Sequence, residues 1–172
     1  VLYAVIVCIA PYAAAASGRS SLAPEVQRRM ELAGELQEYG LRFGFAPTNN
    51  FKTYQEGLES YSLCYYAEKF SLAVKFARGS DCPSDRSKYD IDIKVVEALA
   101  GIATPLSRDL VNAPIARFIM VVFHEDFHEQ MIGAPTLAIN ESAATLLGLL
   151  LAREFAFQKY GAASAVLGEL DS

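Results

Sequence analysis

Apolar residues recur every three to four positions in four stretches of the chain, which is the spacing of a helix with one buried face. The predicted helices run from Pro24 to Gly40 or Gly44, from Ile91 to Ile102, from Asn112 to Ile132 and from Leu137 to Tyr160. Proline or glycine stands close to most of these ends, as expected at helix boundaries. The pattern therefore predicts a predominantly helical chain.

Three further segments are predicted from local patterns. Thr53 and Glu56 have the spacing of a capping box, so a short helix is expected to begin there. From Ser62 to Phe76 apolar residues alternate, which favours a hairpin turning at Glu68-Lys69 over continued helix. Polar residues with Gly and Pro predict a long surface loop from Gly79 to Tyr89. The fold class expected from these elements is α+β.

The composition indicates one domain that does not bind nucleic acid. The chain has 172 residues, is 52% hydrophobic and contains no second compositional block, which suits a single core. Its formal net charge is −5 and its 15 basic residues are scattered along the chain. Binding of a polyanion requires basic residues clustered on one face of the protein, so nucleic acid is not an expected partner.

The first sixteen residues have the pattern of an export signal. They carry no charge and pass from an apolar run, Val1 to Ala10, into an alanine-rich stretch before Ser17. The apolar run is shorter than the roughly 20 residues of a membrane span. Residues 1–17 are therefore predicted to be the remnant of a signal peptide or membrane anchor, with a buried N-terminal element as the alternative. An exported or membrane-associated protein is expected.

The cysteine content allows one disulfide. Cys8 lies in the N-terminal segment, so Cys64 and Cys82 remain as an even pair once that segment is removed. Such a pair can form a bridge in an oxidising compartment, and two buried thiols are the alternative. No Cys-x-x-Cys spacing indicates a thiolate metal site.

The two histidines of the chain lie four residues apart, in a His-Glu-x-x-His motif formed by His124, Glu125 and His128. On a helix this spacing places both rings on one face, where they can hold one Zn²⁺ while Glu125 reaches its water. Glu141 lies about one turn inside the next predicted helix. If the two helices pack antiparallel, Glu141 reaches the height of His128 and completes a His₂Glu site with an open fourth position.

These residues predict zinc-dependent hydrolysis of a peptide bond, with one ion per chain and a peptide or protein as substrate. Zinc lowers the pKa of its water and polarises a carbonyl, and Glu125 takes the proton as general base. A donor is also needed for the negative charge that develops on the carbonyl oxygen. The candidate donors, which the sequence does not rank, are Tyr160, Arg153, Tyr65 and Tyr66.

The segment from Ala113 to Gly148 resembles the bacterial predicted aminopeptidases, which are gluzincin-like zinc metallopeptidases. Their motif is an apolar helix ending in His-Glu-x-x-His, a short turn and an Asn-Glu-Ser segment, which is Asn140-Glu141-Ser142 here. Weaker similarities lie upstream, at Phe43–Pro47, Asn50-Phe51, Tyr54, Phe70–Leu72 and Cys82-Pro83.

That resemblance implies a zincin-like domain over residues 18–172 in an exported or membrane-associated protein. It also implies that His124, His128 and Glu141 are the zinc ligands and that Glu125 is the catalytic base. The expectation of aminopeptidase activity rests on it alone. Only a short stretch follows Glu141, so a C-terminally truncated domain is one interpretation.

Two carboxylates depart from the motif of that family. Asp126 lies between the histidines, where small or apolar residues are usual, and Glu129 replaces a glutamine. Asp126 is expected to face solvent, and the alternatives are tighter metal binding or a raised pKa of Glu125 through like-charge repulsion.

Three other interpretations of the motif remain. The histidines can be a structural, hydrogen-bonded pair. Glu125 and His128 can belong to a di-iron bundle, but that site needs a second Glu-x-x-His element, and Ala144 follows Glu141 at the required spacing. A non-catalytic relative with a structural or partner-binding role is the third, suggested by Asp126 and Glu129.

Overall fold

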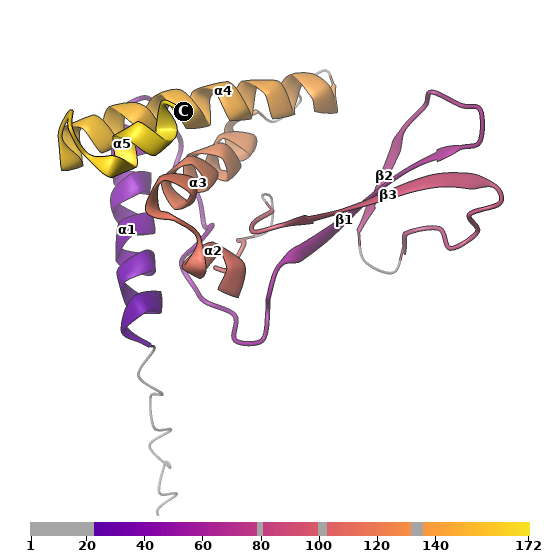
Figure 1. Cartoon of the computed structure of the whole chain (residues 1–172), viewed down its shortest axis with the longest axis horizontal. Helices are drawn as coiled ribbons and strands as arrows, with labels where there is room; N and C mark the ends of the chain where they lie inside the picture. The colour runs from indigo at the N-terminus through magenta and orange to yellow at the C-terminus, as the bar shows by residue number, and fades with distance from the viewer. Residues whose placement is uncertain (1–22, 79–80, 100–102, 132–135) are drawn as a thin grey trace, which may run out of the picture.

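The computed structural model describes residues 23–78, 81–99, 103–131 and 136–172. In chain order its elements are α1 (Pro24–Leu41), β1 (Tyr61–Glu68), β2 (Lys75–Arg78), β3 (Tyr89–Val96), α2 (Arg108–Asn112), α3 (Ile115–Gln130), α4 (Leu137–Tyr160) and α5 (Ala165–Leu170). The fold is α+β and mostly helical, with the helices gathered at one end and the sheet extending away from them (Figure 1). The predicted export signal and the predicted 133–135 turn lie outside the described residues.

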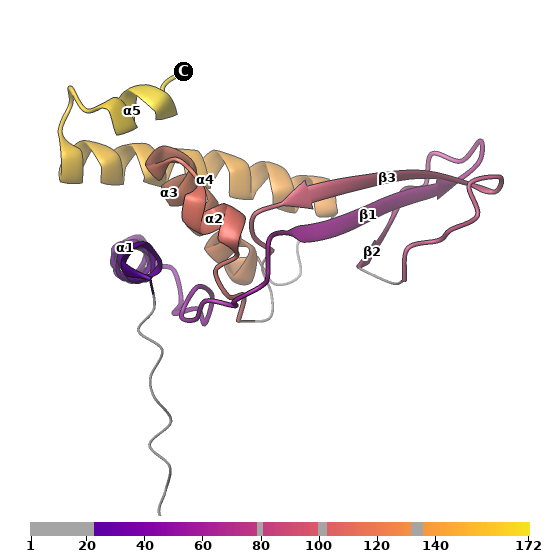
Figure 2. The same cartoon turned by 60° about the horizontal axis from the view of Figure 1, so that its bottom comes forward.

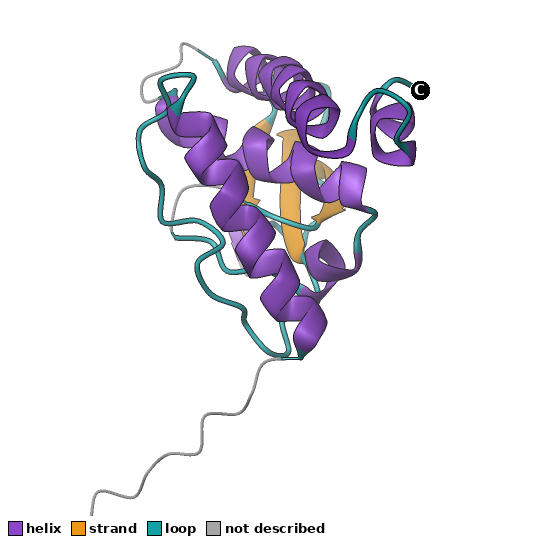
Figure 3. Cartoon of the chain, turned by 90° about the vertical axis from the view of Figure 1, so that its left-hand side faces the viewer, coloured by secondary structure: helices purple, strands orange, loops and turns teal. Residues whose placement is uncertain are grey.

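Helix α3 forms the centre of the helical part. Its residues Phe118, Ile119 and Val122 are completely buried, and α1 and α4 both pack against it. Figure 3 shows the helices from the end of the molecule, with the strands behind them. The continuous apolar face between Ile115 and Phe127 explains this position, because a helix covered on several sides must be apolar around most of its circumference.

The pair of α3 and α4 predicted from the sequence is present. The two helices run in broadly opposite directions and cross (Figures 1 and 2). The bounds of α4 are those predicted, and Thr136 caps its first turn by accepting a hydrogen bond from the Ile139 N–H. The start of α3 is three residues later than predicted, because Asn112 ends the short helix α2 and the extended Pro114 precedes α3.

A three-stranded antiparallel sheet with the order β2-β1-β3 extends from the helices. The predicted hairpin is therefore present, with a longer turn over residues 69–74. Tyr65 pairs with Phe76 on one side and Asp92 on the other, and Leu63 pairs with Lys94. Directly paired residues share a face, so one face of the sheet carries all of these side chains.

The other face of the sheet carries the disulfide between Cys64 and Cys82. The sequence left open whether these cysteines pair, and they do. The bridge ties the middle strand to the loop between β2 and β3. That loop corresponds to the surface loop predicted between Gly79 and Tyr89, and its described part, 81–88, contains no α-helix or strand.

Two predicted helices are wrong. The capping-box pattern at Thr53 starts no helix, and the segment instead forms turns and a bridge between Tyr54 and Leu106. Residues 89–96 form strand β3 instead of a helix. The sequence of this segment is compatible with both structures. Ile91 and Val95 have helical spacing, but apolar residues also alternate with Asp90, Asp92 and Lys94 as in a strand. Pairing with β1 selects the strand.

Candidate metal centre

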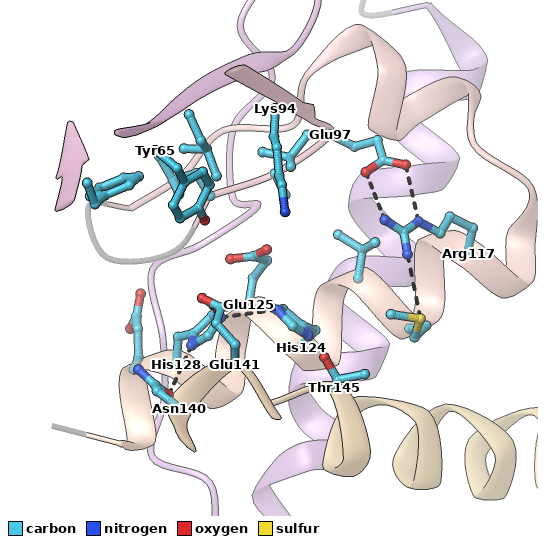
Figure 4. Close-up of a pocket in the computed structure, with 18 of the residues that line it drawn as sticks. Tyr65, Lys94, Glu97, Arg117, His124, Glu125, His128, Asn140, Glu141 and Thr145 are labelled. Carbon is cyan, nitrogen blue, oxygen red and sulfur yellow. Dashed lines mark hydrogen bonds and ion pairs between the residues drawn. The ribbon is translucent and has the colours of Figure 1, made fainter. Parts of the chain in front are cut away.

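The two histidine rings lie side by side near the end of α3. Their Nε2 atoms are 3.1 Å apart and the ring planes are nearly perpendicular. Glu141 reaches them from the start of α4, with Oε2 3.5 Å from His124 Nε2 and Oε1 3.6 Å from His128 Nε2. The sequence thus correctly placed these three side chains together. Figure 4 shows the cluster with Glu125 beside it.

The spacing of these atoms fits a metal ion. One ligand atom from each of the three residues lies within 4.8 Å of the others. Zinc bonds of about 2.1 Å in tetrahedral geometry place ligand atoms about 3.4 Å apart. The two Nε2 atoms are 3.1 Å apart, and the shortest distances from them to the carboxylate, 3.5 Å to Oε2 and 3.6 Å to Oε1, are close to that value, with a different oxygen nearest each ring. The His124, His128 and Glu141 group can therefore hold a metal ion.

Asn140 orients one of the two rings. Its Oδ1 lies 3.1 Å from His128 Nδ1, and an amide oxygen only accepts, so Nδ1 is the protonated nitrogen of that ring. The lone pair of His128 is thereby assigned to Nε2, the atom that faces His124 and Glu141. Such a partner fixes the tautomer of a metal-binding histidine. Asn140 is a site residue that sequence reasoning missed, although it belongs to the Asn-Glu-Ser segment.

The second ring, that of His124, has no orienting partner of this kind among the described residues. His124 Nδ1 is buried and has no hydrogen-bond partner in the described part of the chain. An unpaired buried polar atom costs about 1–3 kcal/mol. Because an ion would bind at Nε2, this cost applies to a metal site and to a structural histidine pair alike. The backbone of His124 lies close against Gly148 of α4, and its Nε2 converges on Glu141.

Glu141 is kept in the charged form that a metal ligand requires. The hydrogen bond with His124 is the main cause that lowers the pKa of its carboxyl, and the positive charge of Lys94 acts in the same direction. Burial opposes them without reversing the shift. A carboxylate rather than a carboxylic acid is the form that coordinates a cation.

The three residues line a cavity of about 970 Å³ between the helices and the sheet. Glu125 and Glu129 of α3 line it too, and Tyr65 and Lys94 line it from the sheet. In Figure 4 the side chains of Tyr65 and Lys94 reach from their strands towards the histidine cluster. The Lys94 ammonium lies 5.2 Å from the centre of the Tyr65 ring.

Of the four candidate donors, only Tyr65 is among the residues that line this cavity. Tyr66 follows it on the opposite face of β1 and stacks edge-on against Tyr89. Arg153 lies far along α4 and pairs with Asp171. Tyr160 ends α4, about 28 Å along the helix axis from Glu141 at 1.5 Å per residue.

Asp126 does not face solvent, which corrects the expectation from the sequence. Its side chain is 3% exposed and accepts hydrogen bonds from Thr48 Oγ1 at 2.8 Å and Asn50 Nδ2 at 3.1 Å. Burial raises its pKa to about 6 against these hydrogen bonds. The side chain does lie away from the metal cluster, but the segment after α1 covers that side of the helix. Through these hydrogen bonds, Asp126 joins α3 to the 48–50 turn.

Comparison of the chain with protein-family models, with curated proteins and with solved structures finds no match. The likeness of residues 113–148 to the zinc metallopeptidases thus rests on the motif and on the geometry just described. No helix in the described ranges is both long and apolar enough to cross a membrane.

Proposed function

We propose that this chain is a zinc-dependent peptide hydrolase with one ion held by His124, His128 and Glu141. The observation that supports it is the convergence of three ligand atoms beside a glutamate, Glu125, at the wall of a cavity large enough for a peptide segment. A bound Zn²⁺ would supply Lewis-acid polarisation of a carbonyl and a lowered pKa of a water ligand.

The protein residues have separate roles in this proposal. Glu125 is the general base that accepts a proton from the attacking water and passes it to the leaving amine. It is adjacent to His124 in the chain and lines the same cavity, so it lies beside the point where the three ligand atoms converge. Asn140 holds His128 in the tautomer that leaves Nε2 available.

Tyr65 is the proposed donor to the substrate carbonyl oxygen. Its side chain reaches into the cavity opposite the histidines. Burial raises the pKa of its hydroxyl, and the negative charges of Glu141 and Asp92 raise it further. The hydroxyl therefore keeps its proton at neutral pH and can donate a hydrogen bond as negative charge develops on the carbonyl oxygen.

Export is proposed on two grounds. The N-terminal pattern resembles a signal peptide, and the Cys64–Cys82 disulfide is consistent with an oxidising compartment outside the cytoplasm. Peptides or proteins in that compartment are the proposed substrates, and aminopeptidase activity is proposed from the family resemblance alone.

A second candidate is a metal-binding protein without catalysis, favoured by Glu129, which departs from the family motif and lines the cavity. The di-iron alternative has less support, because the described residues contain no metal-ligating group of three besides His124, His128 and Glu141. A di-iron site would need further carboxylates and a second histidine element on facing helices.

The Glu125→Gln variant tests the proposed function. Purified wild type and variant are loaded with zinc, the bound metal is measured, and a mixture of peptides of known sequence is analysed for cleavage by mass spectrometry. We expect one zinc per chain in both proteins and cleavage by the wild type only. Zinc binding without cleavage by the wild type would favour the non-catalytic candidate. Two irons per chain in the wild type as purified, before zinc is added, would favour the di-iron one.

A further inference from the structure

The turn between β1 and β2 carries the most exposed large apolar side chains of the described residues. Phe70 is 105% exposed, Leu72 is 99% exposed and Val74 is 66% exposed. We call residues 69–74 the apolar turn. It lies at the end of the sheet that is remote from the helices (Figures 1 and 2). Exposed apolar groups gathered at one point of a surface indicate an interaction site.

The apolar turn has a defined hydrogen-bonded conformation. The Ser71 N–H donates to the Glu68 carbonyl at 2.9 Å, the Ala73 N–H to Ser71 Oγ at 3.1 Å and the Val74 N–H to the Leu72 carbonyl at 3.1 Å. These N–H groups are satisfied within the turn itself. Transfer of a backbone N–H out of water costs far less when it is already hydrogen-bonded.

Two lysines flank the apolar residues. Lys69 precedes Phe70 and Lys75 follows Val74, and no acidic residue stands between them. Their ion pairs, with Asp90 at 3.5 Å and Glu68 at 3.3 Å, are solvent-exposed and therefore weak. Long lysine side chains at such positions can extend their ammonium groups towards anionic headgroups.

An aromatic pair lies just behind the apolar turn. Tyr66 pairs with Lys75 across the β1–β2 ladder, and Tyr89 pairs with Glu68 across the β1–β3 ladder. Their rings meet edge to face at 5.7 Å. Tyrosine is favoured at the boundary between the apolar and polar layers of a membrane, because its ring is apolar and its hydroxyl is polar.

We propose that the apolar turn docks on the surface of an anionic lipid membrane, with Phe70 and Leu72 inserted below the headgroups. From the tip inward come the apolar side chains and then one band of lysines and tyrosines, in which Tyr66 stands level with Lys75. Both residue types are favoured at the boundary between the apolar and polar layers of a bilayer. The two lysines beside the tip favour an anionic lipid surface, because their ammonium groups can reach headgroups while the apolar side chains insert. The proposal uses residues other than those of the metal centre and is independent of the proposed function.

A tryptophan reporter tests this docking. The chain contains no tryptophan, so Phe70→Trp creates a single fluorophore at the tip. We expect its emission to shift to the blue, and to be quenched by brominated lipid, when vesicles of phosphatidylcholine and phosphatidylglycerol are added. The signal is local to the turn, so the apolar residues 1–16 do not generate it. The matched control is Leu150→Trp on α4, at a leucine that is 48% exposed, where we expect no shift.

Second substitutions in the Phe70→Trp protein separate the contribution of apolar insertion from that of the attraction between lysines and anionic headgroups. Leu72→Ser is expected to raise the lipid concentration for half of the shift about tenfold, through lost apolar burial. The Lys69→Glu, Lys75→Glu pair is expected to abolish the shift with the anionic vesicles. An unchanged emission on addition of vesicles would overturn the proposal. A blue-shifted emission before vesicles are added would also overturn it, because the turn would then be covered by protein, such as a second copy of the chain.

Discussion

Gly148 of α4 lies directly against the backbone of His124 in α3. A Cβ atom at position 148 would stand 3.1 Å from the His124 nitrogen and 3.2 Å from its Cα. Gly148 is two turns beyond Glu141, so both residues lie on the side of α4 that faces α3. The completely buried Ala144 and Ala152 lie four residues to either side of Gly148. This stripe of small residues brings α4 close enough for Glu141 to reach the histidines.

We expect Gly148→Ala to loosen the metal centre. Alanine normally stabilises a helix by about 0.5–1 kcal/mol relative to glycine. Here the added methyl group meets backbone, and overpacking of this kind costs about 1–3 kcal/mol. Weaker zinc binding and a lower melting temperature are expected, measured by calorimetry. Gly34→Ala on α1 is the matched control, since nothing lies within 4 Å of its Cβ position. Unchanged zinc affinity in Gly148→Ala would contradict the role given to this contact.

Tyr65→Phe is expected to lower kcat by about 10²–10³-fold, the usual effect of removing one donor to a developing oxyanion. Zinc content and KM are expected to change little, because the hydroxyl acts mainly in the transition state. Tyr66→Phe is the control, as it removes a hydroxyl from the next residue on the opposite face of the strand. Steady-state kinetics on a cleaved peptide provide the measurement. Equal activity in wild type and Tyr65→Phe would remove Tyr65 from the mechanism.

Zinc is expected to stabilise the folded chain. A ligand that binds only the native state adds about 2.7 kcal/mol at a free concentration of 100 times its Kd. The melting temperature should therefore rise on addition of zinc and fall again with a chelator. Glu141→Ala should lose most of this response. Glu129→Ala, which removes a cavity carboxylate outside the ligand group, should keep it. A full zinc response in Glu141→Ala would show that this residue is not a ligand.

Loss of the Asn140 side chain is expected to weaken zinc binding about 10–100-fold, as is typical for partners that orient a metal-bound histidine. Asn140→Ala removes the acceptor that lies 3.1 Å from His128 Nδ1. Asn140→Asp retains an acceptor oxygen and should bind zinc more tightly than the alanine variant. Competition with a chelating dye measures both affinities. Equal affinities in wild type and Asn140→Ala would mean that His128 is oriented by its packing alone.

Asp126→Ala is expected to lower the free energy of unfolding by about 1–3 kcal/mol, since it leaves the buried donors of Thr48 and Asn50 unpaired. Asp126→Asn keeps an acceptor of the same shape and should be clearly less destabilised. Urea denaturation of the metal-free proteins measures the difference. If both variants unfold like the wild type, Asp126 does not secure the 48–50 turn to α3.

Local patterns determined much of the helical framework. The predicted bounds of α4 match the structure, and the start of α1 at Pro24 is also as predicted. The meeting of His124, His128 and Glu141 followed from helical spacing and one short connection between two helices. These features depend on residues close together in the chain, where helix geometry alone sets the distances.

Features that depend on distant residues were decided by the tertiary structure. Residues 89–96 became a strand because β1 offers a pairing edge. Asp126 is buried because Thr48, 78 positions away in the chain, lies against it. Tyr65 could be distinguished from Tyr66 only once the register of the sheet showed which face lines the cavity. Helix periodicity carries information over a few turns, whereas burial and register depend on which distant surface packs against each element.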